Sequence, residues 1–321
     1  MGTRRYLLSK IVQALGTLLF VLTFNFFLFR VLPGDPIGLL ARSQRLTEAD
    51  IAEQRATLGL DQPLPLQYVT YLRQTVEGNL GVSLRTARPV TEIIASRLGP
   101  TLLLVGLGTL LSTVLGIWIG IKGGWQRGSR FDTSTLYGSL ALYSMPEGWL
   151  GMLLLITFSG ILGWFPAGGF ESGGLSGTSR IVDVADHLFL PVLTLTLGYI
   201  GSYSIIMRSS MVDTVNEDFV SIARAKGVPE SLIRRHHVVP NAFLPTFTLI
   251  FLSIGFVLGG AVVVEAVFSW TGIGLLTYNA IQTLDYPLIQ GVFLLSSAAV
   301  IVFNLLADVA YGSMDPRVRV A

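Results

Sequence analysis

The stretch TLLLVGLGTLLSTVLGIWIGI, residues 101–121, carries no charged side chain and is followed directly by Lys122. An α-helix needs roughly 20 apolar residues to cross the hydrocarbon core of a bilayer. This stretch has that length, and a run of this kind is typical of a transmembrane helix. The sequence therefore predicts a protein that is integral to a membrane.

The composition of the whole chain agrees with this prediction. Hydrophobic residues make up 51% of the chain and charged residues only 13%, whereas soluble domains carry about 25% charged residues. A net charge of +2, without a basic run interleaved with aromatics, predicts no nucleic-acid partner. The absence of cysteine excludes disulfides and thiolate metal sites. Three histidines are too few for a convincing metal cluster, so we predict no metal site.

Five further long stretches resemble the one at residues 101–121, and the stretch at residues 133–160 is interrupted by Glu147. The sequence thus predicts an all-α integral membrane protein with six transmembrane helices, at residues 11–29, 101–121, 133–160, 188–207, 242–264 and 286–307. A further uncharged stretch, residues 266–284, is polar and rich in glycine. We interpret it as a re-entrant or surface segment rather than as a span.

The basic residues follow the alternation that six spans require. Cytoplasmic loops are enriched in lysine and arginine, which predicts that both termini and the loop at residues 209–241 are cytoplasmic. The first span could instead be a signal peptide, but its full bilayer length and the lack of a cleavage site favour a retained helix. The basic residues on the predicted inner side are Arg4, Arg5, Lys10, Lys122, Arg127, Arg130, Arg208, Arg224, Lys226, Arg234, Arg235, Arg317 and Arg319.

Three parts of the chain follow from this topology: residues 1–31 with the first span, an external loop at residues 32–99, and a five-helix core at residues 100–321. Helix-start and helix-stop signals in the external loop favour short helices over a structureless linker. The expected helices run from Thr47 to about Leu58, from Pro63 and Pro65 to about Gly78, and from Pro89 and Thr91 into the membrane near Pro100.

The long inner loop contains the segment DFVSIARAKG, residues 218–227. Its pattern predicts a short amphipathic helix with small residues at Ala223 and Ala225, ended by Gly227 and Pro229. Such a helix is too short to span a membrane. It can fit closely into a groove of a soluble partner and transmit a push to the fourth and fifth spans.

This segment resembles the signature loop of ABC importer permeases, in the form found in the dipeptide/oligopeptide/nickel transport family. The match is partial, because Ser221 stands where the general signature has glutamate. Further similar motifs occur in order along nearly the whole chain, and the N-terminal pattern resembles the first permease of the heterodimeric pair. These motifs are residues 33–36, 58–63, 80–83, 145–151, 165–169, 187–191, 264–272, 285–287 and 315–317.

The resemblance implies a type I ABC importer permease, located in the plasma (inner) membrane of a bacterium, that passes peptides inward. Its implied partners are a second homologous permease, two cytoplasmic ATPase subunits, an external substrate-binding protein and the lipid bilayer. ATP and Mg²⁺ belong to the partner subunits, so this chain is expected to be non-catalytic and to hold no cofactor. Its sequence contains no phosphate-binding Gly-x-x-x-x-Gly-Lys-Ser/Thr motif. The residues that the resemblance assigns to ATPase coupling are Asp218, Ser221, Ala223, Arg224, Ala225, Lys226, Gly227 and Asn241.

Three other residues are candidates for the translocation path or gate. Glu147 lies within a span, where an ionisable group usually faces a cavity or a partner; a structural hydrogen bond at the Pro146 kink is the alternative. Glu265 and Trp270 are expected at the outer membrane edge. Nickel or another small solute remains an alternative cargo. An ion-gradient-driven transporter and a membrane-embedded enzyme are alternative classes, which would need more buried carboxylates or converging catalytic groups.

Overall fold

The computed structural model describes residues 3–31, 62–257 and 261–314. The described residues form helices joined by turns, with one isolated β-bridge between Val82 and Pro89. The fold is therefore all-helical within these ranges, as expected. The helices are α1 (Thr3–Val31), α4 (Leu64–Val76), α5 (Val90–Trp125), α6 (Arg130–Tyr143), α7 (Glu147–Leu154), the π-helix η1 (Leu155–Ile161), α8 (Gly177–Val215), α9 (Asp218–Ala225), α10 (Glu230–Leu232), the π-helix η2 (Ile233–Val238), α11 (Val239–Val257), α12 (Val262–Val267), α13 (Ile273–Gln282) and α14 (Tyr286–Met314).

Four helices in the described ranges are long and apolar enough to cross a membrane, namely α1, α5, α8 and α14. A fifth crossing is possible if α6 and the α7–η1 segment together form one span, although they meet at an angle of 100°. The expected third span is thus not straight. It breaks at Pro146, whose backbone is extended and has no amide hydrogen to continue the helix. The expected fifth span falls on α11, which ends just before the undescribed residues 258–260, so a count of six spans stays a prediction.

The external segments differ in part from expectation. Helix α4 matches the helix expected after Pro63, whereas the helix expected from Thr47 lies outside the described residues. The helix expected from Pro89 and the second span form one continuous helix, α5, which runs through Pro100. The expected boundary between residues 99 and 100 therefore falls inside a helix. The stretch 266–284 forms the end of α12 and the ten-residue α13, which is too short to cross a bilayer.

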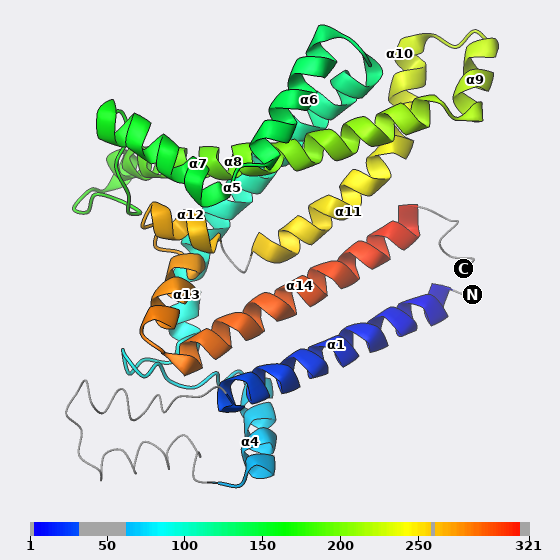
Figure 1. Ribbon diagram of the computed structural model, residues 1–321. Coiled ribbons are helices and arrows are strands. Elements are labelled where there is room, and N and C mark those ends of the chain that lie inside the picture. Colours follow the sequence, from blue (N-terminus) through cyan, green and yellow to red (C-terminus); the bar gives the residue numbers. More distant parts are fainter. Residues whose placement is uncertain (1–2, 32–61, 258–260, 315–321) are drawn as a thin grey trace.

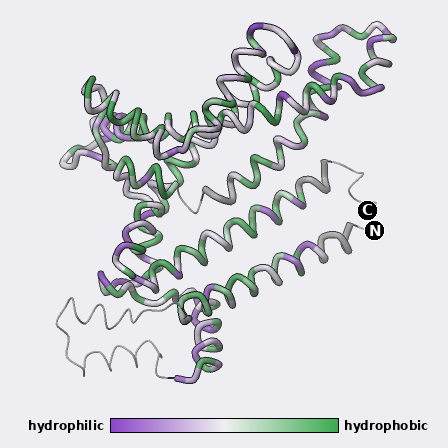
Figure 2. The backbone as a smooth tube through the Cα atoms, in the orientation of Figure 1, coloured by the Kyte–Doolittle hydropathy of each residue, from purple (hydrophilic) through white to green (hydrophobic). Residues whose placement is uncertain are grey.

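The long helices place distant parts of the chain at two opposite ends (Figure 1). The start of α1, the end of α14, the end of α8 and the short helices α9 and α10 lie toward one end, whereas α4, α12 and α13 lie toward the other. Figure 2 shows that the α9–α10 region is more hydrophilic than the long helices that lead to it. Helix α1 packs on α14, where Lys10 pairs with Asp308 at 3.0 Å and the Asn25 amide donates to the Gln290 carbonyl at 3.2 Å.

The closest helix pair is α5 with α8, because glycines line the face of α5 that meets α8. A Cβ atom added at Gly108, Gly116, Gly120 or Gly124 would lie 2.5–2.7 Å from the Cβ of a residue on α8. The residues approached are Leu195, Tyr203, Met207 and Met211. Small residues let two backbones approach each other, which is how membrane helices pack in the absence of a hydrophobic driving force between them.

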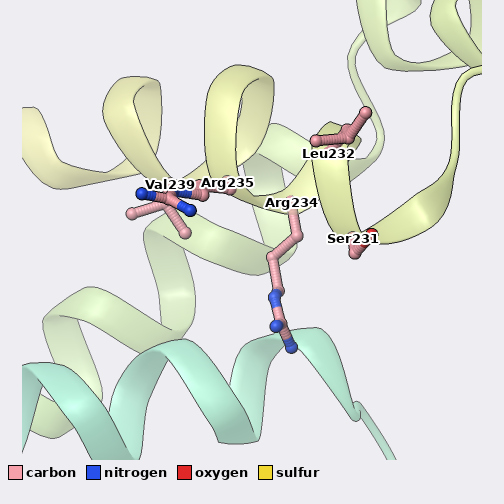
Figure 3. A pocket seen from close by; sticks show the side chains of 5 residues that line it. All are labelled: Ser231, Leu232, Arg234, Arg235 and Val239. Carbon is pink, nitrogen blue, oxygen red and sulfur yellow. The ribbon is translucent and has the colours of Figure 1, made fainter.

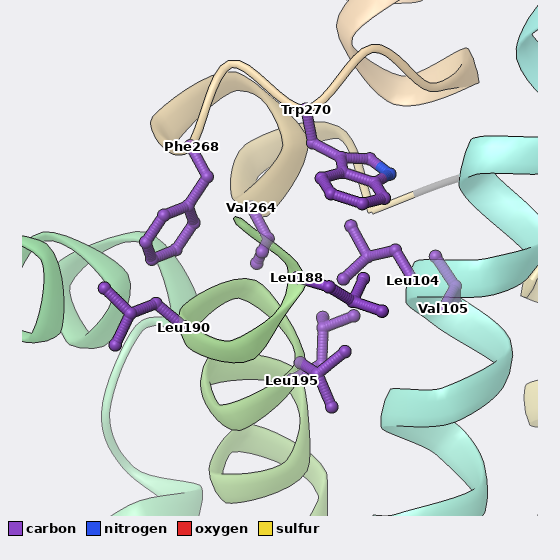
Figure 4. Packing of buried hydrophobic residues seen from close by; sticks show 9 residues of the cluster. Leu104, Val105, Leu188, Leu190, Leu195, Val264, Phe268 and Trp270 are labelled. Carbon is purple, nitrogen blue, oxygen red and sulfur yellow. The ribbon is translucent and has the colours of Figure 1, made fainter. Parts of the chain in front are cut away.

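At the end opposite α9, the segment around α12 packs over α5 and α8 (Figure 4). Phe268 and Trp270 meet side chains from both long helices in one buried cluster. The buried members of this cluster are Leu104, Val105, Leu188, Leu190, Val192, Leu195, Val264, Phe268 and Trp270. This packing holds a chain segment that does not span the membrane against two helices that do.

Replacing Gly116 with alanine should destabilise the protein, since its methyl group would overlap Tyr203 and the backbone of α8. Overpacking of this kind costs about 1–3 kcal/mol. Gly106→Ala is the matched control on the same helix, because no atom lies within 4 Å of a Cβ added there. We expect the midpoint temperature of thermal unfolding, measured in detergent, to fall for Gly116→Ala but not for Gly106→Ala. Equal shifts for the two variants would contradict the packing argument.

Candidate functional site

The loop that the sequence assigned to coupling forms a compact turn after α8. Helix α9 begins after Glu217 and ends in a Schellman motif, in which the Val228 amide donates to the Ala223 carbonyl at 3.2 Å and the Gly227 amide to the Arg224 carbonyl at 2.9 Å. Gly227 has a φ of +75°, a conformation that costs other residues roughly 1–2 kcal/mol. The glycine therefore sets the sharp exit of the chain from α9.

The inner face of α9 is anchored to the long helices. Val220 and Ala223 are buried and belong to one apolar cluster with Met207 and Met211 of α8. The same cluster contains Ile233 and Val238 of η2 and Ala242 of α11. Because all of these side chains are buried together, α9 is joined to both α8 and α11 as one packed unit.

The outer face of α9 is exposed. Of the eight residues assigned to coupling, Ala223 is buried, whereas Asp218, Ser221, Arg224, Ala225, Lys226, Gly227 and Asn241 are exposed. The exposed face also carries Phe219 and Ile222, the latter 54% exposed. The outer face of α9 thus combines charged side chains with two apolar ones.

Two of the residues assigned to ATPase coupling also form hydrogen bonds within the loop. Arg224 donates to Glu230 at 2.8 Å, and this pairing raises the pKa of the Arg224 guanidinium. The Asn241 amide donates to the His237 carbonyl at 2.6 Å. The first contact closes the turn between α9 and α10, so Arg224 shapes the loop as well as contributing charge.

A shallow pocket of about 380 Å³ lies beside this loop (Figure 3). It is lined by Ser231, Leu232, Arg234, Arg235 and Val239. The Arg234 guanidinium lies 5.8 Å from the centre of the Trp125 ring at the end of α5, a cation–π distance. The pocket thus adds two arginines to the surface that α9 presents.

Sequence reasoning missed an ion pair that supports the site. Asp132, at the start of α6, is buried and accepts hydrogen bonds from Arg208 of α8, with Nη2 to Oδ2 at 2.8 Å. Its Oδ2 also accepts from the Gly128 amide at 2.9 Å, while the Asp132 amide donates to the Ser129 hydroxyl. Charges so far apart in sequence cannot be paired from the sequence alone. The only available signal was that each residue lies next to a predicted span.

Two of the three residues assigned to the translocation path are completely buried within this chain. The Glu265 carboxylate accepts from the Thr101 hydroxyl and from the Leu275 amide, both at 3.0 Å. The Trp270 indole donates to the Pro100 carbonyl at 2.9 Å. These bonds join the α12–α13 segment to α5, which is a structural role; a role in the path stays a prediction.

Glu147, the third path residue, is differently placed. It is the first residue of α7, is half-buried, and packs beside Gly198 of α8. Within the described ranges, no group of three or more His, Asp or Glu side chains could hold a metal ion. Together, the long apolar helices and the anchored but exposed α9 define a helical membrane protein with a short amphipathic helix at one end.

Comparison with known proteins places this architecture in a family. Residues 112–320 match the model of the binding-protein-dependent transport system inner membrane component. Residues 3–105 match the model of the N-terminal part of such membrane components. The chain therefore belongs to the family of inner membrane components of binding-protein-dependent transport systems.

Relatives match the chain over nearly its full length. It is 43% identical to a protein of Brucella suis whose name describes a peptide permease, over 98% of this chain and 99% of the relative. It is 34% identical to the oligopeptide transport system permease protein AppB of Bacillus subtilis, over 98% and 99%. It is 38% identical to the glutathione transport system permease protein GsiC of Salmonella typhimurium, over 98% of each chain.

The Asp132–Arg208 pair should show energetic coupling in a double-mutant cycle. Removing either partner leaves the other charge without its counter-ion, so Asp132→Ala and Arg208→Ala should each lower stability. The double variant should be more stable than the sum of the two losses implies, by about 0.5–3 kcal/mol. Thermal unfolding of the purified protein in detergent measures this, and strictly additive losses would contradict the pairing.

Proposed function

We propose that this chain is a permease subunit of an ATP-driven importer that passes peptides from an external binding protein into the cytoplasm. Family membership supports the transport role, and the names of the relatives support peptides over nickel as cargo. The observation that carries the coupling role is that α9 is exposed on one face and packed into α8 and α11 on the other.

The proposed mechanism follows from this packing. A partner that moves α9 also moves the buried cluster beneath it, because close-packed side chains transmit displacement. The cluster includes residues of α8, and α8 in turn lies against the glycine face of α5. A push on α9 therefore reaches the two long helices that pack most closely in the described structure, and tilting them would open one side of the path and close the other.

The partners proposed for this mechanism are those of the family. Two ATPase subunits would bind ATP and Mg²⁺ and receive α9 in a groove, so this chain itself would be non-catalytic. A second homologous permease would complete the path, with this chain as the first permease of the pair. We further propose six spans with both termini cytoplasmic. This arrangement is supported by the start of α1 and the end of α14, which lie at the same end as α9 (Figure 1).

A charge on the exposed face of α9 should prevent docking of the ATPase. Ile222→Asp introduces a carboxylate at an exposed position that is absent from the buried cluster, so the permease itself should still fold. We expect the ATPase subunits to be lost from the complex when it is purified through a tag on the permease.

The matched control is Ile181→Asp, the same change at a residue that is 70% exposed near the start of α8, at the other end of the molecule. This variant should retain the ATPase subunits. Normal copurification of the ATPase subunits and normal transport with Ile222→Asp would contradict the proposed role of α9 in ATPase docking.

Single cysteines can test the proposed topology cleanly, because the native chain has no cysteine. Val76→Cys, at the exposed end of α4, should react with a membrane-impermeant maleimide added to intact spheroplasts. Ala225→Cys, at the end of α9, should react only after the membrane is made permeable. Labelling of both positions in intact cells would overturn the assigned orientation.

A further inference from the structure

Glu147 lies at a depth where a carboxylate is unusual. It packs against α8 at Gly198, since a Cβ atom added to that glycine would lie 3.4 Å from the Cγ of Glu147. Gly198 is about midway between His187 and Arg208, roughly 15 Å from each along the helix axis. These two residues bound the apolar part of α8, so Glu147 lies near the middle of the proposed span.

The chain bends sharply at this position. The angle of 100° between α6 and the α7–η1 segment falls at the residues just before Glu147. Tyr143, at the end of α6, packs against Gly201, with its Cβ 3.2 Å from a Cβ added there. Gly198 and Gly201 are three residues apart and share one face of α8. Both sides of the bend therefore rest on the same patch of α8, which fixes the position of Glu147.

The exposed side chains around the bend include polar and aromatic groups as well as Met145. Tyr143 is 62% exposed and Tyr199 is 38% exposed, and Ser144 is also exposed. Tyr199 directly follows Gly198, the residue of α8 against which the Glu147 side chain packs. Among the described residues, no lysine, arginine or histidine forms an ion pair with Glu147. Within these residues the bend thus carries a carboxylate without an ion-pair partner, together with two exposed tyrosines.

A carboxylate at the position of Glu147 is costly if the bend faces lipid, because an ionised carboxylate at the bilayer centre is strongly disfavoured. It is favourable if the surface faces a water-filled path that cations enter. A carboxylate attracts an ammonium group, and the faces of tyrosine rings add cation–π attraction. The first residue of a helix is also a favourable place for a negative charge.

We propose that Glu147, Tyr143 and Tyr199 form a half-site that receives the ammonium group of a peptide during its passage through the membrane. The second permease would close the other half. This inference rests on the proposed function, because it names the part of the cargo that the path recognises. It gives the chain a preference for cationic groups at mid-depth, before the peptide reaches the cytoplasm.

The test uses Ser144→Cys as a reporter in the assembled importer, because it is exposed and close in sequence to Glu147. Two thiol reagents of similar size are compared, the cationic trimethylammonium-ethyl methanethiosulfonate and the anionic sulfonatoethyl methanethiosulfonate. We expect the cationic reagent to react faster, and the ratio of the two rates to fall about tenfold when Glu147→Gln is added. Leu110→Cys, at an exposed apolar position within α5, is the control, and we expect it to react with neither reagent.

Two outcomes would overturn the half-site. If Ser144→Cys reacts with neither reagent, the surface faces lipid. If the rate ratio is the same with and without Glu147, either the carboxylate is neutralised by a basic residue of the second permease or it does not act on the path. Both outcomes are independent of the cargo, so they are distinct from a failure of the proposed function.

A second experiment measures peptide transport. Import of trialanine by the complete importer in proteoliposomes should show a half-saturating concentration about tenfold higher for Glu147→Gln, with partial recovery for Glu147→Asp. Import unaffected by Glu147→Gln would count against the half-site. If the wild-type importer moves no peptide at all, the proposed function fails, whereas the reagent experiment still decides whether Glu147 faces an aqueous path that favours cations.

Discussion

The close approach of α5 and α8 is the contact on which the rest of the structure depends. It exists because glycines recur along one face of α5, so the two backbones meet where ordinary side chains would keep them apart. The α9 helix, the α6–α7 bend and the α12 segment are all attached to this pair. Helix α9 continues from the end of α8, the α6–α7 bend rests on Gly198 and Gly201, and the α12 segment packs over both helices.

Both ends of the pair combine a buried apolar cluster with a buried carboxylate that accepts several hydrogen bonds. At the α9 end, a buried apolar cluster and the Asp132–Arg208 ion pair join α6, α8, α9 and α11. At the opposite end, the cluster around Phe268 and Trp270 joins α5, α8 and α12. There the Thr101 hydroxyl donates to Glu265 and the Trp270 indole donates to the Pro100 carbonyl, so that α5 is also bonded to the α12–α13 segment. A buried polar group is costly unless it is bonded, so these bonds help to specify one arrangement at each end.

Much of this could be predicted from the sequence, because the signals are local. Uncharged stretches of bilayer length indicated the long helices, and Gly227 with Pro229 indicated the end of α9. The sequence did not indicate that α5 would continue through Pro100, since proline usually interrupts a helix. It also did not indicate that Glu265 and Trp270, expected at the outer membrane edge, would be buried by hydrogen bonds to α5, because nothing local shows which partners a distant helix will supply.

The sequence by itself determined the membrane class, the helical fold and the family resemblance, because hydrophobic length and ordered motifs are properties of neighbouring residues. Only the tertiary structure decided which groups meet: Asp132 with Arg208, Glu265 with Thr101, and Glu147 with Gly198. These pairings join residues on different helices, and their geometry is set by how closely α5, α8 and the α6–α7 bend pack. The roles of the charged residues therefore follow from packing, which no single segment encodes.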